Sequence, residues 1–233
     1  MPATNLILLP GLDGTGKLFC DFIDALAPSL VAKPIKYPSD KFLSYAELLS
    51  FLHANMPESQ PFVLLAESFS TPLAIRYAAT APGNLRALVL CAGFVTNPVG
   101  RLVPVAVAAA PCLFNLKPPD IIIEHFLAGP NAPAALLSKI RGILDNVDAR
   151  VIRARVREIF SCDARTELSN VAVPTMHLRP SDDRLISMDA IDDIRLAKPD
   201  ILFKSIRGPH MILQREPRAS ASIISEFVQQ LNS

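Results

Sequence analysis

The stretch VLLAESFSTPLAIRYAA, residues 63–79, contains an apolar run that stops at Ser68 and resumes at once with helical spacing. This pattern predicts a buried strand, a tight turn at the serine and a helix directly after it. The side chain of Ser68 would then project from the carboxyl edge of a sheet, beside the free N–H groups that begin the helix. Ser68 is therefore a candidate nucleophile.

Alternating strand-like and helix-like patterns extend along most of the chain. The strand-length apolar runs are mostly continuous rather than alternating, as expected for strands that are covered on both faces. Helical patterns separate them, so the sequence predicts an α/β fold with a doubly wound, parallel sheet. The predicted strands span residues 5–9, 31–36, 62–66, 85–91, 173–178 and 201–206, and the predicted helices span 17–26, 44–56, 71–79, 188–197 and 217–231.

The alternation breaks once, between Phe94 and about Asn170, where a much longer segment replaces the usual single crossover helix. Three stretches within it, IIIEHFLAG, PAALLSKIRGILDNV and ARVIRARVREIF, carry apolar residues at helical spacing. We therefore expect residues 1–95 and 171–233 to form the core, and residues 96–170 to form a helical cap over the carboxyl edge of the sheet.

The composition bounds the class of protein. With 233 residues, half of them apolar, the chain can bury the core of one domain. Lys and Arg total 23 and Asp and Glu total 22, so no basic surface of the kind that binds nucleic acid is expected. The four cysteines are far apart and show no metal-binding spacing, so we expect free thiols and no metal.

Two features of the sequence argue against a membrane protein. The most apolar segment, residues 101–116, is shorter than the roughly 20 residues that a membrane span needs, and it contains two prolines. The N-terminal sequence MPATNLILLPG lacks the basic segment and long apolar region of a secretory signal. We therefore expect no membrane span and a cytoplasmic location.

Ser68 lies in Ala66-Glu67-Ser68-Phe69-Ser70, a relaxed form of the G-x-S-x-G nucleophile elbow in which alanine and serine replace the glycines. The elbow requires small residues two positions before and after the nucleophile, because strand and helix approach closely there. A serine that caps the following helix would give the same pentapeptide. The pentapeptide alone leaves both interpretations open.

A serine hydroxyl needs a base to accept its proton, and the sequence offers four histidines. His53, His125 and His177 fall within a predicted helix, the cap and a predicted strand, where packing explains them. His210 instead lies four residues after the last predicted strand, on a Gly-Pro loop ahead of a helix. This is the position expected of the base, and a surface-loop histidine is the alternative.

The imidazole in turn needs a carboxylate that holds its tautomer and stabilises its charge. Asp182 and Asp183 follow the predicted strand 173–178, on the same edge of the sheet. Asp183 fits the pattern of a turn, an aspartate and an aliphatic pair better than Asp182, which remains the alternative. The chain order serine, aspartate, histidine is the one that α/β-hydrolases use.

Acyl transfer also needs donors for the oxyanion of its tetrahedral intermediate. One candidate is the backbone N–H of Phe69, directly after the nucleophile. The other is the backbone N–H of Leu12, on the loop ILLPGLDGTGKLF after the first predicted strand. Glycines at positions 11, 14 and 16 would let this loop turn its amides inward.

The same loop suggests a rival class, since G-L-D-G-T-G-K at residues 11–17 matches the phosphate-binding pattern G-x-x-x-x-G-K. The match fails at Leu18, where a P-loop needs a Ser or Thr hydroxyl for Mg²⁺. No predicted strand ends in an aspartate that could be the second Mg²⁺ anchor. A P-loop nucleotide hydrolase is therefore a distant alternative, as is a hydrolase-fold receptor without turnover.

The segments LLPGLDGTG, AESFSTP, SDDRL and RGPH together resemble the α/β-hydrolase superfamily, over a span from Asn5 to the C-terminus. They are most similar to small bacterial carboxylesterases of the pimeloyl-carrier-protein methyl ester esterase-like type. The opening P-G-x-D-G-T-G also resembles the hydrolase region of plant phytyl-ester synthases, which are acyltransferases. The chain departs from the family pattern at its elbow glycines and in having Pro10-Gly11 for the usual His-Gly.

A third departure is that the chain begins almost at the oxyanion strand. The resemblance then implies an α/β-hydrolase fold with about six mostly parallel strands rather than eight. It also implies an esterase that needs no metal or cofactor, in which Ser68 attacks the ester, His210 takes the proton and Asp183 holds His210. A thioesterase or acyltransferase, or a peptidase or C–C bond hydrolase, would use the same residues.

The cap is expected to supply the pocket for an uncharged aliphatic or aromatic small-molecule ester. An acyl carrier protein is a possible partner, and the arginines at 150, 153, 155 and 157 are expected to form a solvated face that it could use. For each candidate pocket residue, simple packing of the cap onto the core is the alternative. The candidates are Val103, Val105, Val107, Leu113, Phe114, Ile122 and Phe126.

Overall fold

Six strands form a single sheet in residues 3–99 and 120–231, the part of the chain that the computed structural model describes. The strands are β1 (Thr4–Leu9), β2 (Leu30–Pro34), β3 (Phe62–Glu67), β4 (Leu85–Cys91), β5 (Thr175–Pro180) and β6 (Leu202–Ile206). Every neighbouring pair is parallel, and the order is β2-β1-β3-β4-β5-β6. The winding therefore reverses between β1 and β3, which confirms the predicted doubly wound architecture.

Strand β3 shows why the apolar runs of the sequence are continuous. All six of its residues are buried. Val63 and Leu65 belong to one hydrophobic cluster, whereas Leu64 and Ala66 belong to another on the opposite face of the sheet. Each face therefore requires its own layer of helices.

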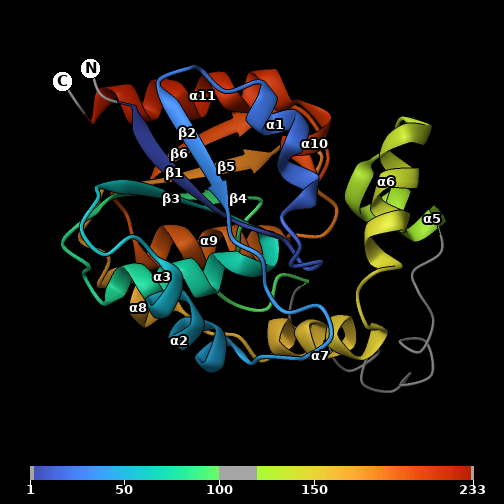
Figure 1. The fold of residues 1–233 in the computed structure, drawn as a ribbon, viewed down its shortest axis with the longest axis horizontal. Coiled ribbons are helices and arrows are strands. Elements are labelled where there is room, and N and C mark those ends of the chain that lie inside the picture. The colour runs from blue at the N-terminus through green and yellow to red at the C-terminus, as the bar shows by residue number, and fades with distance from the viewer. Residues whose placement is uncertain (1–2, 100–119, 232–233) are drawn as a thin grey trace.

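Helices cover both faces of the sheet (Figure 1). On one face lie α1 (Cys20–Asp24), α10 (Ile212–Arg215) and α11 (Pro217–Gln230). On the other lie α2 (Tyr45–Asn55), α3 (Thr71–Ala79), α8 (Arg165–Ser169) and α9 (Met188–Ala197). The bounds of α3 and α9 are those predicted, whereas the predicted helix 17–26 divides into the short 3-10 helix η1 (Lys17–Phe19) and α1.

Residues 120–160 fold into helices beyond the carboxyl ends of the strands, on the right of Figure 1. They are α5 (Asp120–Ile122), the π-helix η4 (Ile123–Ala128), α6 (Ala134–Leu144) and α7 (Ala149–Phe160). A third hydrophobic cluster joins Ile123 and Ile140 of this segment to Leu18 and Met211 of the core. The division into core and cap stays a prediction, because residues 100–119 lie outside the described part of the chain.

The helices of the described ranges differ in length and polarity. None of them combines the length and the apolar character that crossing a membrane would require.

Candidate active site

The loops that carry the candidate residues leave the same edge of the sheet. β1 pairs with β3 in a register that sets Leu9 opposite Ala66, so the loop after β1 and the turn after β3 begin side by side. Asp183 follows β5 and His210 follows β6. Because parallel strands share one carboxyl edge, these loops meet over a single surface at the point where the winding reverses.

Ser68 occupies a strained turn between β3 and α3. Its φ is 49°, in the left-handed region that residues other than glycine rarely adopt. It begins the 3-10 turn η2 (Ser68–Ser70), and the N-cap of α3 is Ser70 rather than Ser68. The Oγ atom of Ser68 lies 2.8 Å from Nε2 of His210. The structure therefore gives Ser68 the geometry of a nucleophile elbow and not that of a helix cap.

His210 and Asp183 form a buried, hydrogen-bonded pair. Nδ1 of His210 lies 2.8 Å from Oδ2 of Asp183, and the side chains are 4% and 6% exposed. The other carboxylate oxygen, Oδ1, accepts bonds from the backbone N–H groups of Leu185 at 2.8 Å and Ile186 at 3.1 Å. Asp182 is exposed and its N–H donates to the carbonyl of the neighbouring loop. The structure thus brings Asp183, rather than Asp182, to the histidine.

Burial and charge oppose each other in this pair. Burial disfavours protonation of the imidazole, but the carboxylate of Asp183 and then that of Glu67 outweigh it and raise the pKa of His210. Burial likewise disfavours the charged carboxylate, yet His210 and the two amides outweigh it and lower the pKa of Asp183. The arrangement holds an ionised carboxylate against an imidazole that readily accepts a proton.

The two predicted amide donors lie on neighbouring loops. Phe69 directly follows the serine, and Leu12 is the second residue of a β-turn closed by a 3.0 Å bond from the Gly14 N–H to the Gly11 oxygen. Gly14 has a φ of 71°, which explains a glycine at the end of this turn. The N–H groups of Leu12 and Phe69 are therefore candidates for an oxyanion site.

Comparison with known proteins bears on this architecture. No family model and no curated protein matches the chain. Among solved structures, a lipase-esterase related protein from Clostridium acetobutylicum superimposes with a TM-score of 0.79 at 13% identity, over 97% of this chain and 95% of that one. The chain has the α/β-hydrolase fold.

Two further α/β-hydrolase structures are similar over nearly the whole chain. The enol-lactonase from Burkholderia xenovorans gives a TM-score of 0.79 at 14% identity, over 98% of this chain and 92% of that one. A carboxylesterase from Nitrososphaera gargenis gives 0.78 at 15% identity, over 99% and 91%. At this level of identity the similarity establishes the fold.

One residue of this candidate site was not predicted as functional. Glu67, directly before the serine, is 6% exposed, and its Oε2 accepts a bond from Nε2 of Gln214 at 3.4 Å. Its Oε1 has no hydrogen-bond partner among the described residues. Burial raises the pKa of Glu67 to about 7, although the bond from Gln214 and the charge of His210 lower it in part. A carboxylate at the end of an otherwise apolar strand is the sequence signal that could have identified it.

Arg155 corrects the expectation of a solvated arginine face on α7. Arg157 is exposed and the Arg150 side chain is 84% exposed, but Arg155 is only 1% exposed and lies against the loop after β1. The missed signal is its position four residues after the buried Val151, which puts both on the same helix stripe. A charged residue on an apolar stripe can be buried when the fold supplies enough acceptors.

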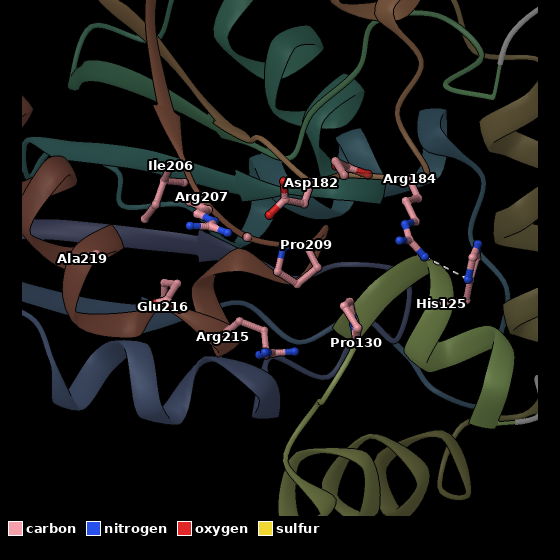
Figure 2. A pocket seen from close by; sticks show the side chains of 13 residues that line it. His125, Pro130, Asp182, Arg184, Ile206, Arg207, Pro209, Arg215, Glu216 and Ala219 are labelled. Carbon is pink, nitrogen blue, oxygen red and sulfur yellow. Dashed lines mark hydrogen bonds between the residues drawn. The ribbon is translucent and has the colours of Figure 1, made fainter.

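A cavity of about 720 Å³ has Asp183 in its lining and lies next to the His–Asp pair. Figure 2 shows its lining side chains. Asp183 and the Gly208-Pro209 segment before His210 form part of its wall, and η4 contributes His125. The side chains of Arg184 and His125 meet at one end, with Nη1 and Nδ1 3.0 Å apart. Other basic and acidic residues line it, namely Asp182, Arg207, Arg215 and Glu216. It is a polar recess beside the pair, and its described lining does not include Ser68.

Two of the predicted pocket residues, Ile122 and Phe126, lie in the described part of the chain. Ile122 ends α5 and is 42% exposed, and Phe126 lies in η4 and is 36% exposed. Neither residue is in the described lining of this recess. The other predicted pocket residues, Val103, Val105, Val107, Leu113 and Phe114, lie outside the described residues. Their role in binding stays a prediction.

Proposed function

We propose that this protein is a serine-dependent carboxylic ester hydrolase. The observation that carries the proposal is the continuous chain from Ser68 Oγ to His210 Nε2, and from His210 Nδ1 to Asp183 Oδ2, with both distances 2.8 Å. A serine at positive φ on a strand-to-helix turn, with a buried base and an ionised carboxylate behind it, is the arrangement that acyl transfer requires.

In the first step, Ser68 Oγ attacks the ester carbonyl carbon while His210 Nε2 takes the hydroxyl proton. Asp183 holds Nδ1–H and stabilises the resulting imidazolium. The tetrahedral intermediate collapses, the bond to the alcohol oxygen breaks, and His210 returns its proton to the departing alcohol. The acyl group is then bound to Ser68.

In the second step, His210 takes a proton from water, whose oxygen attacks the acyl carbon. The bond to Ser68 Oγ breaks as His210 returns the proton to it, and the acid leaves. In both steps the N–H groups of Leu12 and Phe69 would donate hydrogen bonds to the oxyanion. In other enzymes, removal of a single donor of this kind lowers kcat by about 10²- to 10³-fold. No metal or cofactor takes part in the proposed mechanism.

The geometry of the loop after β1 does not favour the nucleotide-hydrolase alternative. A phosphate-binding loop presents its amides together with the N-terminus of a long helix. In this chain the loop leads into η1 and then into α1, which has five residues. The carbonyls of Leu12 and Asp13 are bound by Arg155, so the loop is organised around a cation of the protein.

The test is the substitution Ser68→Ala, with Ser181→Ala, an exposed serine on the loop after β5, as the matched control. Ser68→Ala should remove hydrolysis of p-nitrophenyl butyrate and labelling by a fluorophosphonate probe, while the circular dichroism spectrum and thermal midpoint stay unchanged. The control should retain both activities. Unchanged turnover in Ser68→Ala would end the triad assignment. A wild-type protein that is labelled at Ser68 but hydrolyses no ester would favour the receptor alternative.

The same triad could serve an esterase, a thioesterase or an acyltransferase, which differ in leaving group and acyl acceptor. A thioesterase or acyltransferase would retain Ser68-dependent labelling but prefer acyl thioesters, including those on a carrier protein, or an alcohol acceptor. Comparing kcat/KM for matched oxygen esters and thioesters, with and without added alcohol, separates these activities. We expect oxygen esters and water to be preferred.

A further inference from the structure

Arg155 reaches from α7 into the loop that carries Leu12. Its Nη1 donates to the carbonyl oxygens of Leu12 and Asp13, each at 2.9 Å, and its Nη2 donates to the carbonyl of Pro38 at 2.8 Å. A guanidinium can make several such bonds at once because its donors are fixed in a plane. One side chain therefore holds two successive carbonyls of the β-turn.

The remaining carbonyls of this loop are also bound. The Gly11 oxygen accepts from the Gly14 N–H at 3.0 Å, and the Gly14 oxygen accepts from the N–H of Tyr37 at 2.8 Å. The Pro10 oxygen accepts from the hydroxyl of Ser70. Every carbonyl oxygen from position 10 to position 14 thus accepts a hydrogen bond within the protein. Hydrogen bonds therefore hold each of these carbonyls, and Arg155 binds the two central ones of the turn.

The residues around Arg155 are adapted to its presence. A Cβ atom at position 14 would lie 2.4 Å from Nη1 of Arg155, so the φ of +71° is not the only reason for Gly14. The guanidinium lies 5.7 Å from the ring centre of Tyr37 and 5.9 Å from that of Phe69, the residue that carries the second amide donor. Arg155 therefore contacts both loops of the candidate oxyanion site.

Burial of the Arg155 guanidinium costs free energy because it removes a charged group from water. Arg155 is 1% exposed, and its Nε has no hydrogen-bond partner among the described residues. The nearby carboxylate of Asp13, itself 7% exposed, offsets part of the charge and bonds to the N–H of Thr15 at 2.8 Å. An apolar side chain would fill the same space without the cost of desolvating a guanidinium. What an apolar residue could not do is bind the two carbonyls.

We propose that Arg155 is a positioning residue for the oxyanion hole: it fixes the β-turn that presents the Leu12 N–H and braces the Phe69 ring beside it. This rests on the proposed ester hydrolysis. Arg155 lies on α7, within the predicted cap, so the cap would organise the catalytic donors as well as the pocket. The cost of burying the guanidinium is then a cost of preorganising the site.

The test compares Arg155→Met with Arg157→Met, an exposed arginine two positions along the same helix. Arg155→Met should lower kcat for p-nitrophenyl butyrate by about 10- to 100-fold, while KM changes by less than about threefold, because an oxyanion donor acts in the transition state. Binding of a trifluoromethyl ketone, which forms an oxyanion on the serine, should weaken in parallel with kcat. Binding of the corresponding secondary alcohol, which forms none, should not. Arg157→Met should change none of these.

Arg155→Lys covers the case in which Arg155→Met does not fold. A lysine keeps the charge in the same space but lacks the planar pair of donors, so kcat should fall less than in Arg155→Met and KM should again be retained. Folded Arg155 variants with wild-type kcat, or with equal losses for ketone and alcohol, would overturn the proposal. So would failure of both variants to fold, which would assign Arg155 to stability alone. Ser68-dependent turnover of the wild type tests the esterase assignment separately.

Discussion

At the scale of single residues, two buried carboxylic acids with different environments lie near His210. Asp183 receives hydrogen bonds on both oxygens and has a lowered pKa. Glu67 receives one long bond, leaves Oε1 without a partner among the described residues, and has a pKa raised to about 7. Environments that push two carboxyl pKa values apart assign different roles to them. In the proposed mechanism Asp183 would orient His210 as the base, whereas Glu67 would adjust the pKa of His210.

This difference predicts the effect of Glu67→Gln on the pH profile. The negative charge of Glu67 contributes to the raised pKa of His210, so its removal should lower that pKa. Hydrolysis requires neutral His210, so the acidic limb of the kcat/KM profile should move to lower pH. A glutamine at this position could also donate to Oε1 of Gln214, which has no hydrogen-bond partner in the described part of the chain, so the fold should be retained.

The measurement is kcat/KM for p-nitrophenyl butyrate between pH 5 and pH 9. Glu58→Gln, which removes an exposed carboxylate elsewhere, is the control and should leave the profile in place. An acidic limb that stays at its wild-type pH in Glu67→Gln, or that moves to higher pH, would contradict the assigned role of Glu67.

At the scale of elements, the accuracy of the sequence-based predictions follows the strength of the local signal. β4, α3 and α9 have the predicted bounds because their apolar patterns end at clear breaks. The short helices α8 and α10 were missed, since four or five residues carry too little periodicity to be distinguished from loop. The burial of Arg155 was missed because its cause lies far away in the sequence, in the carbonyls of residues 12, 13 and 38.

The candidate site was predictable to the extent that its residues follow strands. Ser68, Asp183 and His210 each follow a recognisable apolar strand, and parallel topology brings such positions to one edge. The choice between Asp182 and Asp183 could not be settled by spacing alone, because it depends on which carboxylate the turn directs at the imidazole. In the structure the amides of Leu185 and Ile186 hold the Asp183 carboxylate, which is the one hydrogen-bonded to His210.

Helix α2 connects a local capping motif to the site. Its N-cap Ser44 accepts from the Glu47 N–H at 3.3 Å, and the Glu47 side chain accepts from the Ser44 N–H at 2.8 Å. The next residue, Tyr45, donates its hydroxyl to the Phe69 carbonyl at 2.7 Å, and its ring stacks on Phe69 at 5.0 Å. The start of α2 therefore supports the turn that follows Ser68.

Loss of the Ser44 N-cap should lower both the stability and the activity of the protein. Ser44→Ala removes the side chain that closes the capping box and should lower the free energy of unfolding by about 1 kcal/mol. The loosened first turn should also lower kcat by a few-fold, through Tyr45, while KM is retained. Ser50→Ala, at an exposed interior position of the same helix, should change the free energy of unfolding by less than about 0.5 kcal/mol and leave kcat unchanged. Equal urea midpoints for Ser44→Ala and wild type would contradict this prediction.

At the scale of the whole molecule, stability resides in two apolar layers, one on each face of the sheet, and in a smaller cluster that joins η4 and α6 to Leu18 and Met211. Most polar groups that are buried in such layers are hydrogen-bonded, and a charged group without a partner is costly there. His177, in the middle of β5, is 1% exposed; its Nε2 lies 3.2 Å from the Gly93 carbonyl, and its Nδ1 has no partner among the described residues. A neutral imidazole that donates through Nε2 fits this site, whereas an imidazolium would bury an unpaired charge.

The molecule should therefore lose stability in mild acid because of His177. Burial lowers the pKa of His177 from 6.5 to about 4. Between these two values the unfolded chain binds a proton at this residue and the folded chain does not, so the free energy of unfolding falls as the pH falls through this window. The full difference corresponds to about 3 kcal/mol. His177→Phe keeps an aromatic ring against Phe203, whose ring centre lies 5.2 Å away, and removes the titrating group.

Urea unfolding at pH 7.0 and pH 4.5 provides the measurement. Between these values the free energy of unfolding of wild type should fall by about 2–3 kcal/mol more than that of His177→Phe, because the other titrating groups are common to both proteins. The exposed His53 on α2 supplies the control, since His53→Phe removes an imidazole from the surface and should follow wild type. Parallel losses in wild type and His177→Phe would show that the acid sensitivity of the core does not come from His177.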